Sequence, residues 1–330
     1  MKERIGIVGG GSMGTAIVKI IQSKSLKLNW YIRNPKIIEH IKDYYHNPDY
    51  LTYVQLIPDN LDITDDIKSL IDNSDIIIWA IPSAFLHDTI KSIDRKILKN
   101  KIHISSIKGI VSEFNVSVSE YFNKEFDVPY QNIGIIAGPC HAEEVAMEKL
   151  SYLTVVSSNQ NIIKIIRELL ICRYINVNVS SDIIGIEYAT VLKNIVAIAA
   201  GICFGIGYGD NFQSILTINA INEIERFINV VCPTRRNIND SVYAGDIIVT
   251  MYSNFSRNRV FGTLIGKGYS VQYSRIEIKM ISEGYYAVKS IHEINKSLNI
   301  DLPIINAVYN ILYENTSPAI EMKILEEKLS

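Results

Sequence analysis

The stretch Arg4-Ile5-Gly6-Ile7-Val8-Gly9-Gly10-Gly11-Ser12-Met13-Gly14 opens the chain and decides the fold of its first half. A short apolar run leads straight into G-x-G-x-x-G, and residues 15–21 have the pattern of a helix. In that context Gly9 permits a tight turn, Gly11 lets the backbone approach a pyrophosphate, and Gly14 lets the helix pack on the strand. The free N–H groups of the helix would face the phosphates. The segment therefore predicts a dinucleotide site, with a plain glycine turn as the alternative.

Composition narrows the class of protein. The chain has 330 residues, of which 48% are hydrophobic and 21% charged, and this suits a soluble protein of two domains. A net charge of −2 gives no signal for nucleic acid. The longest apolar stretch, residues 195–206, is predicted to be too short to span a bilayer. We expect a cytoplasmic protein without a membrane span, and the sequence is also compatible with a homodimer.

Cysteine and histidine patterns argue against a disulfide framework and against a metal site. The cysteines are far apart and form no C-x-x-C pair, and the six histidines show no i, i+4 pairing. A Cys140/His141 nucleophile is disfavoured, because the two neighbours are expected to point apart.

The first half alternates strand-like and helix-like segments, which predicts a mostly parallel sheet with helices on both faces. The strands are predicted at residues 4–8, 28–32, 75–81, 102–107, 133–137 and 153–157, and helices at 35–45 and 84–93. After residue 182 the strand signal fades, and helices are predicted at 183–200, 212–229, 276–298 and 303–314. We therefore predict an α/β fold with a Rossmann-like, NAD(P)-binding domain (residues 1–182) and an all-helical domain for substrate binding and catalysis (residues 183–330).

Ligands of an open parallel sheet bind beyond the carboxyl ends of its strands. The residues there are polar, small or basic: 9–14, 33–34, 82–83, 108–109 and 138–140. Arg33 follows the second strand, where an acidic residue would favour NAD. An arginine can instead meet a 2′-phosphate, so NADP is slightly favoured over NAD, with a solvated arginine as the alternative. Lys108 could place a charge near a phosphate or carbonyl, although an exposed surface lysine is the simpler interpretation.

The helical half carries a lysine within an almost entirely apolar segment, Leu192 to Gly201. Burial would lower the pKa of Lys193 and suit it to general acid/base work, whereas a snorkelling lysine is the alternative. Asp246 could pair with it, or simply occupy a turn after Gly245. The segment 253–259 concentrates hydroxyl, amide and guanidinium donors that could grip a phosphate, if it is more than a polar loop.

Together these stretches resemble bacterial-type NAD(P)-dependent glycerol-3-phosphate dehydrogenases over nearly the whole chain. The matching segments lie in family order at residues 9–16, 47–51, 81–83, 108–109, 138–144, 185–187, 192–194, 205–211, 245–246, 256–262 and 283–285. Any one of them is weak, but their order and spacing are specific.

The resemblance implies interconversion of dihydroxyacetone phosphate and sn-glycerol 3-phosphate, which supplies glycerophospholipid synthesis. It implies that Lys193 is the proton donor and acceptor, with Lys108 and Asp246 around the reacting carbon. The implied substrate contacts are Lys108, Gly138, Cys140, Asn194, Asp246, Thr250, Ser256, Arg257 and Asn258. The implied cofactor contacts are Gly9, Gly11, Ser12, Met13, Gly14, Arg33, Lys108, Ala142, Arg257, Ile281 and Glu283.

Two departures from the family pattern and two alternatives remain. Cys140 stands where the family has Ser or Thr, and a thiol is a weaker donor. Residues 242–245 replace the usual glycine-rich approach to Asp246. A β-hydroxyacid dehydrogenase or ketopantoate reductase is one alternative, disfavoured by Ser256-Arg257-Asn258. A non-catalytic NAD(P) sensor is the other, disfavoured by the retained Lys193 and Asp246.

Overall fold

A computed structural model describes residues 3–278 and 282–329. Contacts divide the chain into two compact units, one of residues 1–107 and 118–183 and the other of residues 108–117 and 184–330. The predicted boundary after residue 182 did not include the excursion at residues 108–117. Lys108 therefore belongs to the same unit as Lys193.

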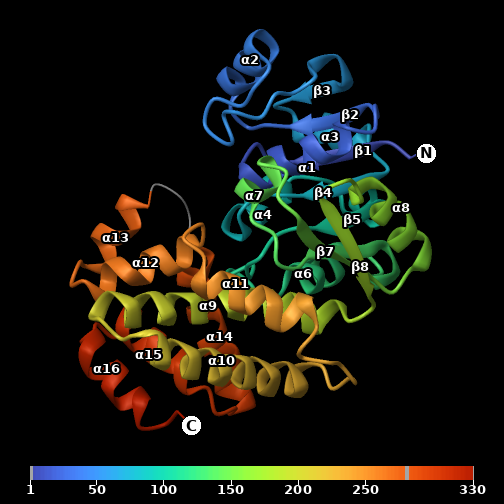
Figure 1. Cartoon of the computed structure of the whole chain (residues 1–330). Coiled ribbons are helices and arrows are strands. Elements are labelled where there is room, and N and C mark those ends of the chain that lie inside the picture. The colour runs from blue at the N-terminus through green and yellow to red at the C-terminus, as the bar shows by residue number, and fades with distance from the viewer. Residues whose placement is uncertain (1–2, 279–281, 330) are drawn as a thin grey trace. The chain divides into compact units, whose positions relative to one another are not determined.

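The first unit is built on an eight-stranded sheet in the order β3-β2-β1-β4-β5-β6-β7-β8 (Figure 1). All neighbours are parallel except β6 and β7, which are antiparallel. The strands are β1 (Ile5–Val8), β2 (Leu28–Tyr31), β3 (Leu61–Thr64), β4 (Ile76–Trp79), β5 (Ile102–Ser105), β6 (Ile133–Ala137), β7 (Ser151–Ser157) and β8 (Ile175–Ser180). The predicted mostly parallel sheet is confirmed.

Helices and short turns connect these strands. They are α1 (Ser12–Gln22), α2 (Pro35–Tyr44), η1 (Pro58–Asn60), α3 (Ile67–Asp72), η2 (Ser83–Phe85), α4 (Leu86–Ile90), α5 (Arg95–Lys99), α6 (Val118–Phe126), η3 (Tyr130–Asn132), α7 (Ala142–Ala146) and α8 (Gln160–Leu170). The central strands β1 and β4 are buried along their whole length, because helices shield both faces of a parallel sheet. The strands β3 and β8, which form the two edges of the sheet, were not predicted, because buried and exposed residues alternate in them and give no continuous apolar run.

The second unit is helical, as predicted. Its elements are α9 (Ile183–Ile206), α10 (Asp210–Val231), a π-helical turn η4 (Ser241–Gly245), α11 (Asp246–Tyr252), α12 (Arg257–Gly266), α13 (Val271–Glu277), α14 (Glu283–Leu298), α15 (Pro303–Tyr313) and α16 (Pro318–Glu326). The helix predicted over residues 276–298 is confirmed from Glu283 to Leu298 as α14, but its predicted start is wrong, because α13 ends at Glu277 and Ser282 has an extended backbone (φ −86°, ψ 103°).

The long helix α9 forms the core of this unit. Its 24 residues are long and apolar enough to cross a membrane. The prediction that this apolar stretch is too short to span a bilayer was therefore wrong, because it counted only residues 195–206. However, 83% of its most apolar window is buried inside the protein. This burial is typical of the core helix of a globular domain.

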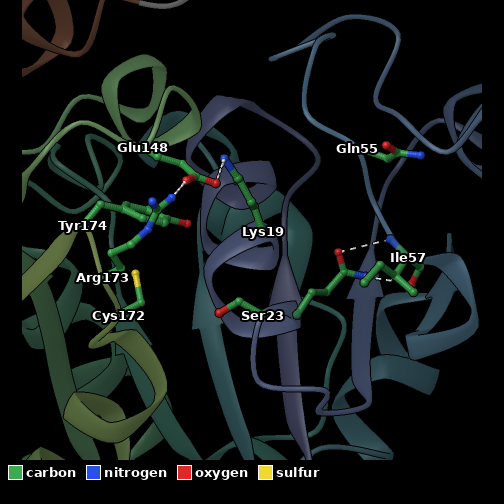
Figure 2. A pocket seen from close by; sticks show the side chains of 9 residues that line it. Lys19, Ser23, Gln55, Ile57, Glu148, Cys172, Arg173 and Tyr174 are labelled. Carbon is green, nitrogen blue, oxygen red and sulfur yellow. Dashed lines mark hydrogen bonds and ion pairs between the residues drawn. The ribbon is translucent and has the colours of Figure 1, made fainter.

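A pocket of about 370 Å³ lies at the C-terminal end of α1 (Figure 2). Its charged groups are engaged with one another, because Glu148 pairs with both Lys19, at 3.2 Å, and Arg173. Lys19 also donates to the carbonyl of Ala146 at 2.6 Å. None of the residues expected to bind substrate or cofactor lines this pocket, so we do not assign it to the reaction.

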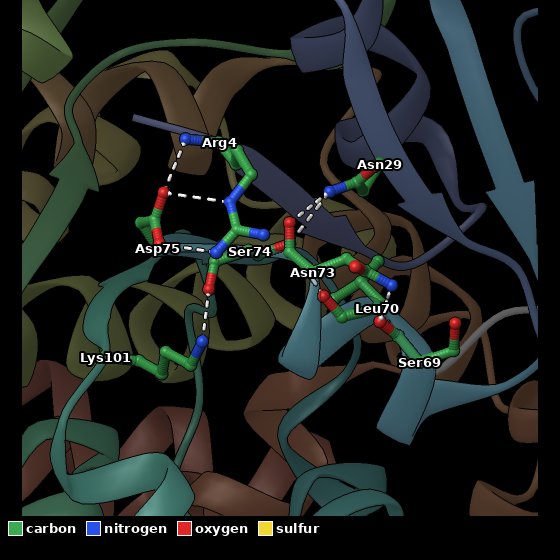
Figure 3. Close-up of polar contacts among 8 residues, drawn as sticks. All are labelled: Arg4, Asn29, Ser69, Leu70, Asn73, Ser74, Asp75 and Lys101. Carbon is green, nitrogen blue, oxygen red and sulfur yellow. Dashed lines mark hydrogen bonds and ion pairs between the residues drawn. The ribbon is translucent and has the colours of Figure 1, made fainter. Parts of the chain in front are cut away.

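The starting ends of β1 and β4 are closed by a structural network (Figure 3). Arg4 donates side-chain bonds to both carboxylate oxygens of Asp75, at 3.2 and 2.9 Å, and Lys101 donates to the carbonyl of Ser74 at 2.6 Å. The Ser74 hydroxyl in turn donates to the carbonyl of Leu70 at 2.7 Å. These groups are occupied with each other, which leaves the carboxyl ends of the strands as the edge for ligands.

Candidate active site

The glycine loop has the geometry that a pyrophosphate requires. Gly9 has φ +124°, and a Cβ at Gly14 would lie 2.0 Å from the carbonyl oxygen of Gly9, so both positions need glycine. A Cβ at Gly11 would meet nothing within 4 Å. Gly11 is also the N-cap of α1, and no side chain caps that helix end. The N–H groups of Ser12, Met13 and Gly14 are therefore left for an anion.

Two side chains that the sequence analysis did not single out anchor this loop. Trp30 donates its indole N–H to the carbonyl of Gly9 at 2.9 Å. Asn47, fully buried, donates to the carbonyl of Gly10 at 2.9 Å and to the Thr15 hydroxyl at 3.0 Å. Asn47 belongs to the stretch 47–51 that resembles the family, so the sequence marked it as a residue of interest. Only the fold shows that it supports the glycine loop.

Arg33 lies just beyond the end of β2 and is exposed. Its guanidinium lies over the ring of Phe85, 5.3 Å from the ring centroid. A cation and an exposed aromatic ring at a strand end suit the adenosine part of a dinucleotide.

Other residues expected to bind ligands follow β6. Gly138 has a left-handed backbone (φ +107°), and it turns the chain out of the strand. Cys140 is buried, and Ala142 begins the short helix α7. Gly138 and Cys140 thus follow the carboxyl end of β6, the edge of the sheet at which the sequence predicts ligand-binding residues.

The second unit contains a buried ion pair between Lys193 of α9 and Asp246 of α11. The two side chains are only 3% and 2% exposed. Burial lowers the pKa of Lys193 to about 7, while Asp246 opposes this shift and Lys108 adds to it. This is the lysine environment that the apolar segment predicted, and it rules out the snorkelling alternative.

Asp246 uses only one of its two carboxylate oxygens in the ion pair. One of its carboxylate oxygens pairs with Lys193, whereas Oδ2 is buried and, among the described residues, has no hydrogen-bond partner. A buried carboxylate oxygen without a partner is costly, so it is suited to accept a bond from a ligand hydroxyl. Asp246 is not in a turn but is the first residue of α11, following the π-helical turn.

The segment expected to grip a phosphate is a helix start rather than a polar loop. Ser256 is the N-cap of α12 and accepts from the Arg259 N–H at 3.3 Å. Arg257 is exposed and makes no ion pair within the described part of the chain. Thr250, one turn after Asp246, is buried and donates to the Asp246 carbonyl at 2.6 Å.

Asn258 and Asn194 contact each other. Asn258 donates to the side-chain oxygen of Asn194 at 2.9 Å, and Asn194 donates to the backbone carbonyl of Lys108 at 2.7 Å. Glu283 lies in the first turn of α14, whereas Ile281 falls outside the described residues. The structure thus contains two sets of contacts in this unit, the Lys193–Asp246 ion pair and the hydrogen-bonded chain of Asn258, Asn194 and the Lys108 carbonyl.

Comparison with known proteins shows the family of the chain. The profile of the NAD-dependent glycerol-3-phosphate dehydrogenase N-terminus matches residues 4–163, and the profile of the C-terminus of the same enzyme matches residues 182–323. A glycerol-3-phosphate dehydrogenase (NAD(P)+) of Clostridium botulinum is 33% identical over 330 residues, with 99% of both chains covered. The chain belongs to the NAD-dependent glycerol-3-phosphate dehydrogenase family.

Solved structures agree with this membership. The glycerol-3-phosphate dehydrogenase of Coxiella burnetii superposes with a TM-score of 0.90 at 26% identity and covers 99% of both chains. A ketopantoate reductase from Ralstonia eutropha superposes with a TM-score of 0.61 at 11% identity, which shows a shared fold alone. The resemblance inferred from the sequence is confirmed, and so is the enzyme class of glycerol-3-phosphate dehydrogenases.

Proposed function

We propose that this protein reduces dihydroxyacetone phosphate to sn-glycerol 3-phosphate, reversibly, with NAD(P)H. The observation that carries the proposal is the buried Lys193–Asp246 pair, in which one carboxylate oxygen has no partner among the described residues. A lysine whose pKa lies near neutrality exchanges a proton at physiological pH, and the free oxygen can accept a bond from a substrate hydroxyl. Membership of the glycerol-3-phosphate dehydrogenase family supports the choice of substrate.

The first unit fits a nicotinamide dinucleotide. The uncapped start of α1 and the open side of Gly11 suit its pyrophosphate, and Arg33 suits a 2′-phosphate, so NADP is slightly favoured over NAD. Ser12, Met13, Ala142 and Glu283 are the further contacts proposed from the resemblance. When bound, the reduced nicotinamide supplies the hydride that reaches C2 of the substrate.

Lys193 and Lys108 act on the C2 oxygen. As C2 accepts a hydride, negative charge develops on that oxygen, and two cationic groups in a buried site stabilise the charge. Lys193 then donates its proton to the oxygen, and in the reverse reaction neutral Lys193 takes the proton back. Asp246 keeps the Lys193 ammonium oriented through their ion pair.

Phosphate binding is proposed for the start of α12. Arg257 is exposed and unpaired among the described residues, so its guanidinium is available to a phosphate as a bidentate donor. Ser256, Asn258, Asn194 and Thr250 complete the proposed contacts, and the helix start adds a favourable dipole. Gly138 and Cys140 are proposed to border the substrate.

The cellular role is proposed from the reaction product. The product is a precursor of glycerophospholipids, so the protein would serve lipid synthesis as a cytoplasmic enzyme. A homodimer is compatible with this role, and no nucleic-acid partner is proposed because the net charge is only −2.

The test is NADPH and NADH oxidation with dihydroxyacetone phosphate, against ketopantoate and a control without substrate. Dihydroxyacetone phosphate should be reduced and ketopantoate should not. Lys193→Ala should bind cofactor but lose turnover by roughly two to four orders of magnitude. Turnover of ketopantoate instead would favour a reductase of that type, and cofactor binding without any turnover would favour a sensor.

A further inference from the structure

A continuous chain of hydrogen bonds, which we call the relay, runs through the second unit. The Ser282 hydroxyl donates to Asn258 Oδ1 at 2.6 Å, and the Gly284 N–H donates to the same oxygen at 3.0 Å. Asn258 Nδ2 donates to Asn194 Oδ1 at 2.9 Å, and Asn194 Nδ2 donates to the Lys108 carbonyl at 2.7 Å. The relay thus joins the start of α14 to Lys108 by way of α12 and α9.

The direction of the relay is set by backbone groups at both ends. The N–H of Gly284 can only donate, and the carbonyl of Lys108 can only accept. Both amides must therefore present their oxygen towards α14 and their nitrogen towards Lys108. Ser282, Asn258 and Asn194 are all buried, so a flipped amide would leave polar groups without partners.

Ser282 has a use other than helix capping. It occupies the N-cap position of α14, where a serine hydroxyl ordinarily accepts a bond from the first turn. Here its side chain makes no such cap bond. The hydroxyl is committed to Asn258 instead, so removing it would act on the relay rather than on the helix end.

The other end of the relay holds Lys108. Among the described residues, the bond from Asn194 is the one hydrogen bond to the backbone of Lys108. The side chain of Lys108 lies close enough to Lys193 to influence its protonation. A shift of the Lys108 backbone would therefore change the electrostatics of the proton donor.

We propose that Ser282 is a positioning residue of the reaction, which holds Lys108 beside Lys193 through Asn258 and Asn194. In this role Ser282 contacts neither the substrate nor the reacting atoms. The inference rests on the proposed function, in which Lys193 donates the proton at C2.

The variants Ser282→Ala, Ser282→Thr and Ser290→Ala test it. Ser290 is a second buried serine of α14 that takes no part in the relay, so it is the matched control. The measurements are kcat and KM for dihydroxyacetone phosphate, the pH profile of reductive kcat, and the Kd of NADPH from its fluorescence.

Ser282→Ala should lower kcat about tenfold with little change in KM or Kd, because Lys108 loses its place near the reacting oxygen. The apparent pKa of the profile should rise, because Lys108 would no longer lower the pKa of Lys193. Ser282→Thr, which keeps the hydroxyl, should restore both values, and Ser290→Ala should change neither. If Ser282→Ala does not fold, Ser282→Cys, a weaker donor, should shift both values less but in the same direction.

An unchanged kcat and pH profile in Ser282→Ala would overturn the proposal, and so would equal losses in Ser282→Ala and Ser290→Ala. Lys193→Ala, assayed in parallel, distinguishes a failure of the relay from a failure of the proposed function. If Lys193→Ala is inactive while Ser282→Ala matches wild type, only the relay is wrong. If Lys193→Ala keeps its turnover, the proton-donor role itself is wrong.

Discussion

A methyl group added at Gly262 is expected to lower both stability and turnover, because helices α9 and α12 touch at their backbones there. A Cβ at Gly262 would lie 2.1 Å from the carbonyl oxygen of Ile198. The approach is reciprocal, since a Cβ at Gly201 would lie 2.1 Å from the carbonyl oxygen of Arg259. Neither obstacle is a flexible side chain, so Gly262→Ala can be accommodated only if the two helices separate.

The size of that separation follows from the geometry. Ordinary contact begins at 3.4 Å, so the helices must part by 3.4 − 2.1 = 1.3 Å near residue 262. The Asn258–Asn194 bond joins the same two helices one turn away and is 2.9 Å long, so a shift of this size would take it beyond bonding range. Overpacking costs about 1–3 kcal/mol, whereas the better helix propensity of alanine returns at most about 1 kcal/mol. Misplacing Asn194 and Lys193 by about 1 Å can also cost up to ~100-fold in turnover.

Urea denaturation and steady-state kinetics of Gly262→Ala measure both effects. The control is Gly209→Ala, because Gly209 has φ −82° and a Cβ there would meet nothing within 4 Å. We expect Gly262→Ala to be destabilised by about 1–3 kcal/mol and its kcat to fall at least tenfold, with Gly209→Ala near wild type in kcat. A Gly262→Ala protein at least as stable and as active as wild type would refute the close approach of α9 and α12.

Four further predictions follow from particular side chains. Reductive kcat should fall by about tenfold per pH unit above about pH 7, because the pKa of Lys193 is lowered to about 7 by burial and only its protonated form donates; a flat pH–rate profile would contradict this. Arg257→Ala should raise KM for dihydroxyacetone phosphate at least ~tenfold, unlike the exposed control Arg235→Ala, and an unchanged KM would remove Arg257 from the phosphate site. Arg33→Asp should weaken NADPH binding relative to NADH in a fluorescence titration; equal affinities before and after would show that Arg33 is not the selector. Burial raises the pKa of Glu223 from 4.5 to about 7, so its contribution to stability is present below pH 4.5 and is lost as pH rises through about 7. The loss is roughly 3 kcal/mol at most, and Glu223→Gln should remove this pH dependence in urea denaturation, which an unaltered dependence would disprove.

The correct predictions rest on patterns contained within short, continuous segments of sequence. The strand β1, the glycine loop and α1 lie in one short segment, so sequence spacing alone predicts their geometry. The burial of Lys193 likewise follows from its apolar neighbours on α9, because a helix that is apolar nearly all round must be enclosed.

The errors arise where local signals are weak. Helix α12 was not predicted, because the polar residues Arg257, Asn258 and Arg259 at its start resemble a loop, and its glycines lower its helix propensity. Glycine is nevertheless required there by the tertiary packing, because a Cβ at Gly262 or Gly266 would lie 2.1 or 2.2 Å from a backbone carbonyl oxygen of α9. The break between α13 and α14 was missed because residues 276–298 look continuous in pattern, whereas Ser282 turns aside to bond Asn258.

The sequence by itself determined the fold class, the dinucleotide loop, the family and the identity of the central lysine, because each depends on residue types at fixed spacing. Only the tertiary structure decided that Asp246 keeps a carboxylate oxygen free, that Asn47 supports the glycine loop, and that Ser282 is linked to Lys108. Those facts depend on side chains far apart in the chain, and their hydrogen bonds need distances within a few tenths of an ångström. Residue spacing does not encode such distances; the packing of α9, α11, α12 and α14 sets them.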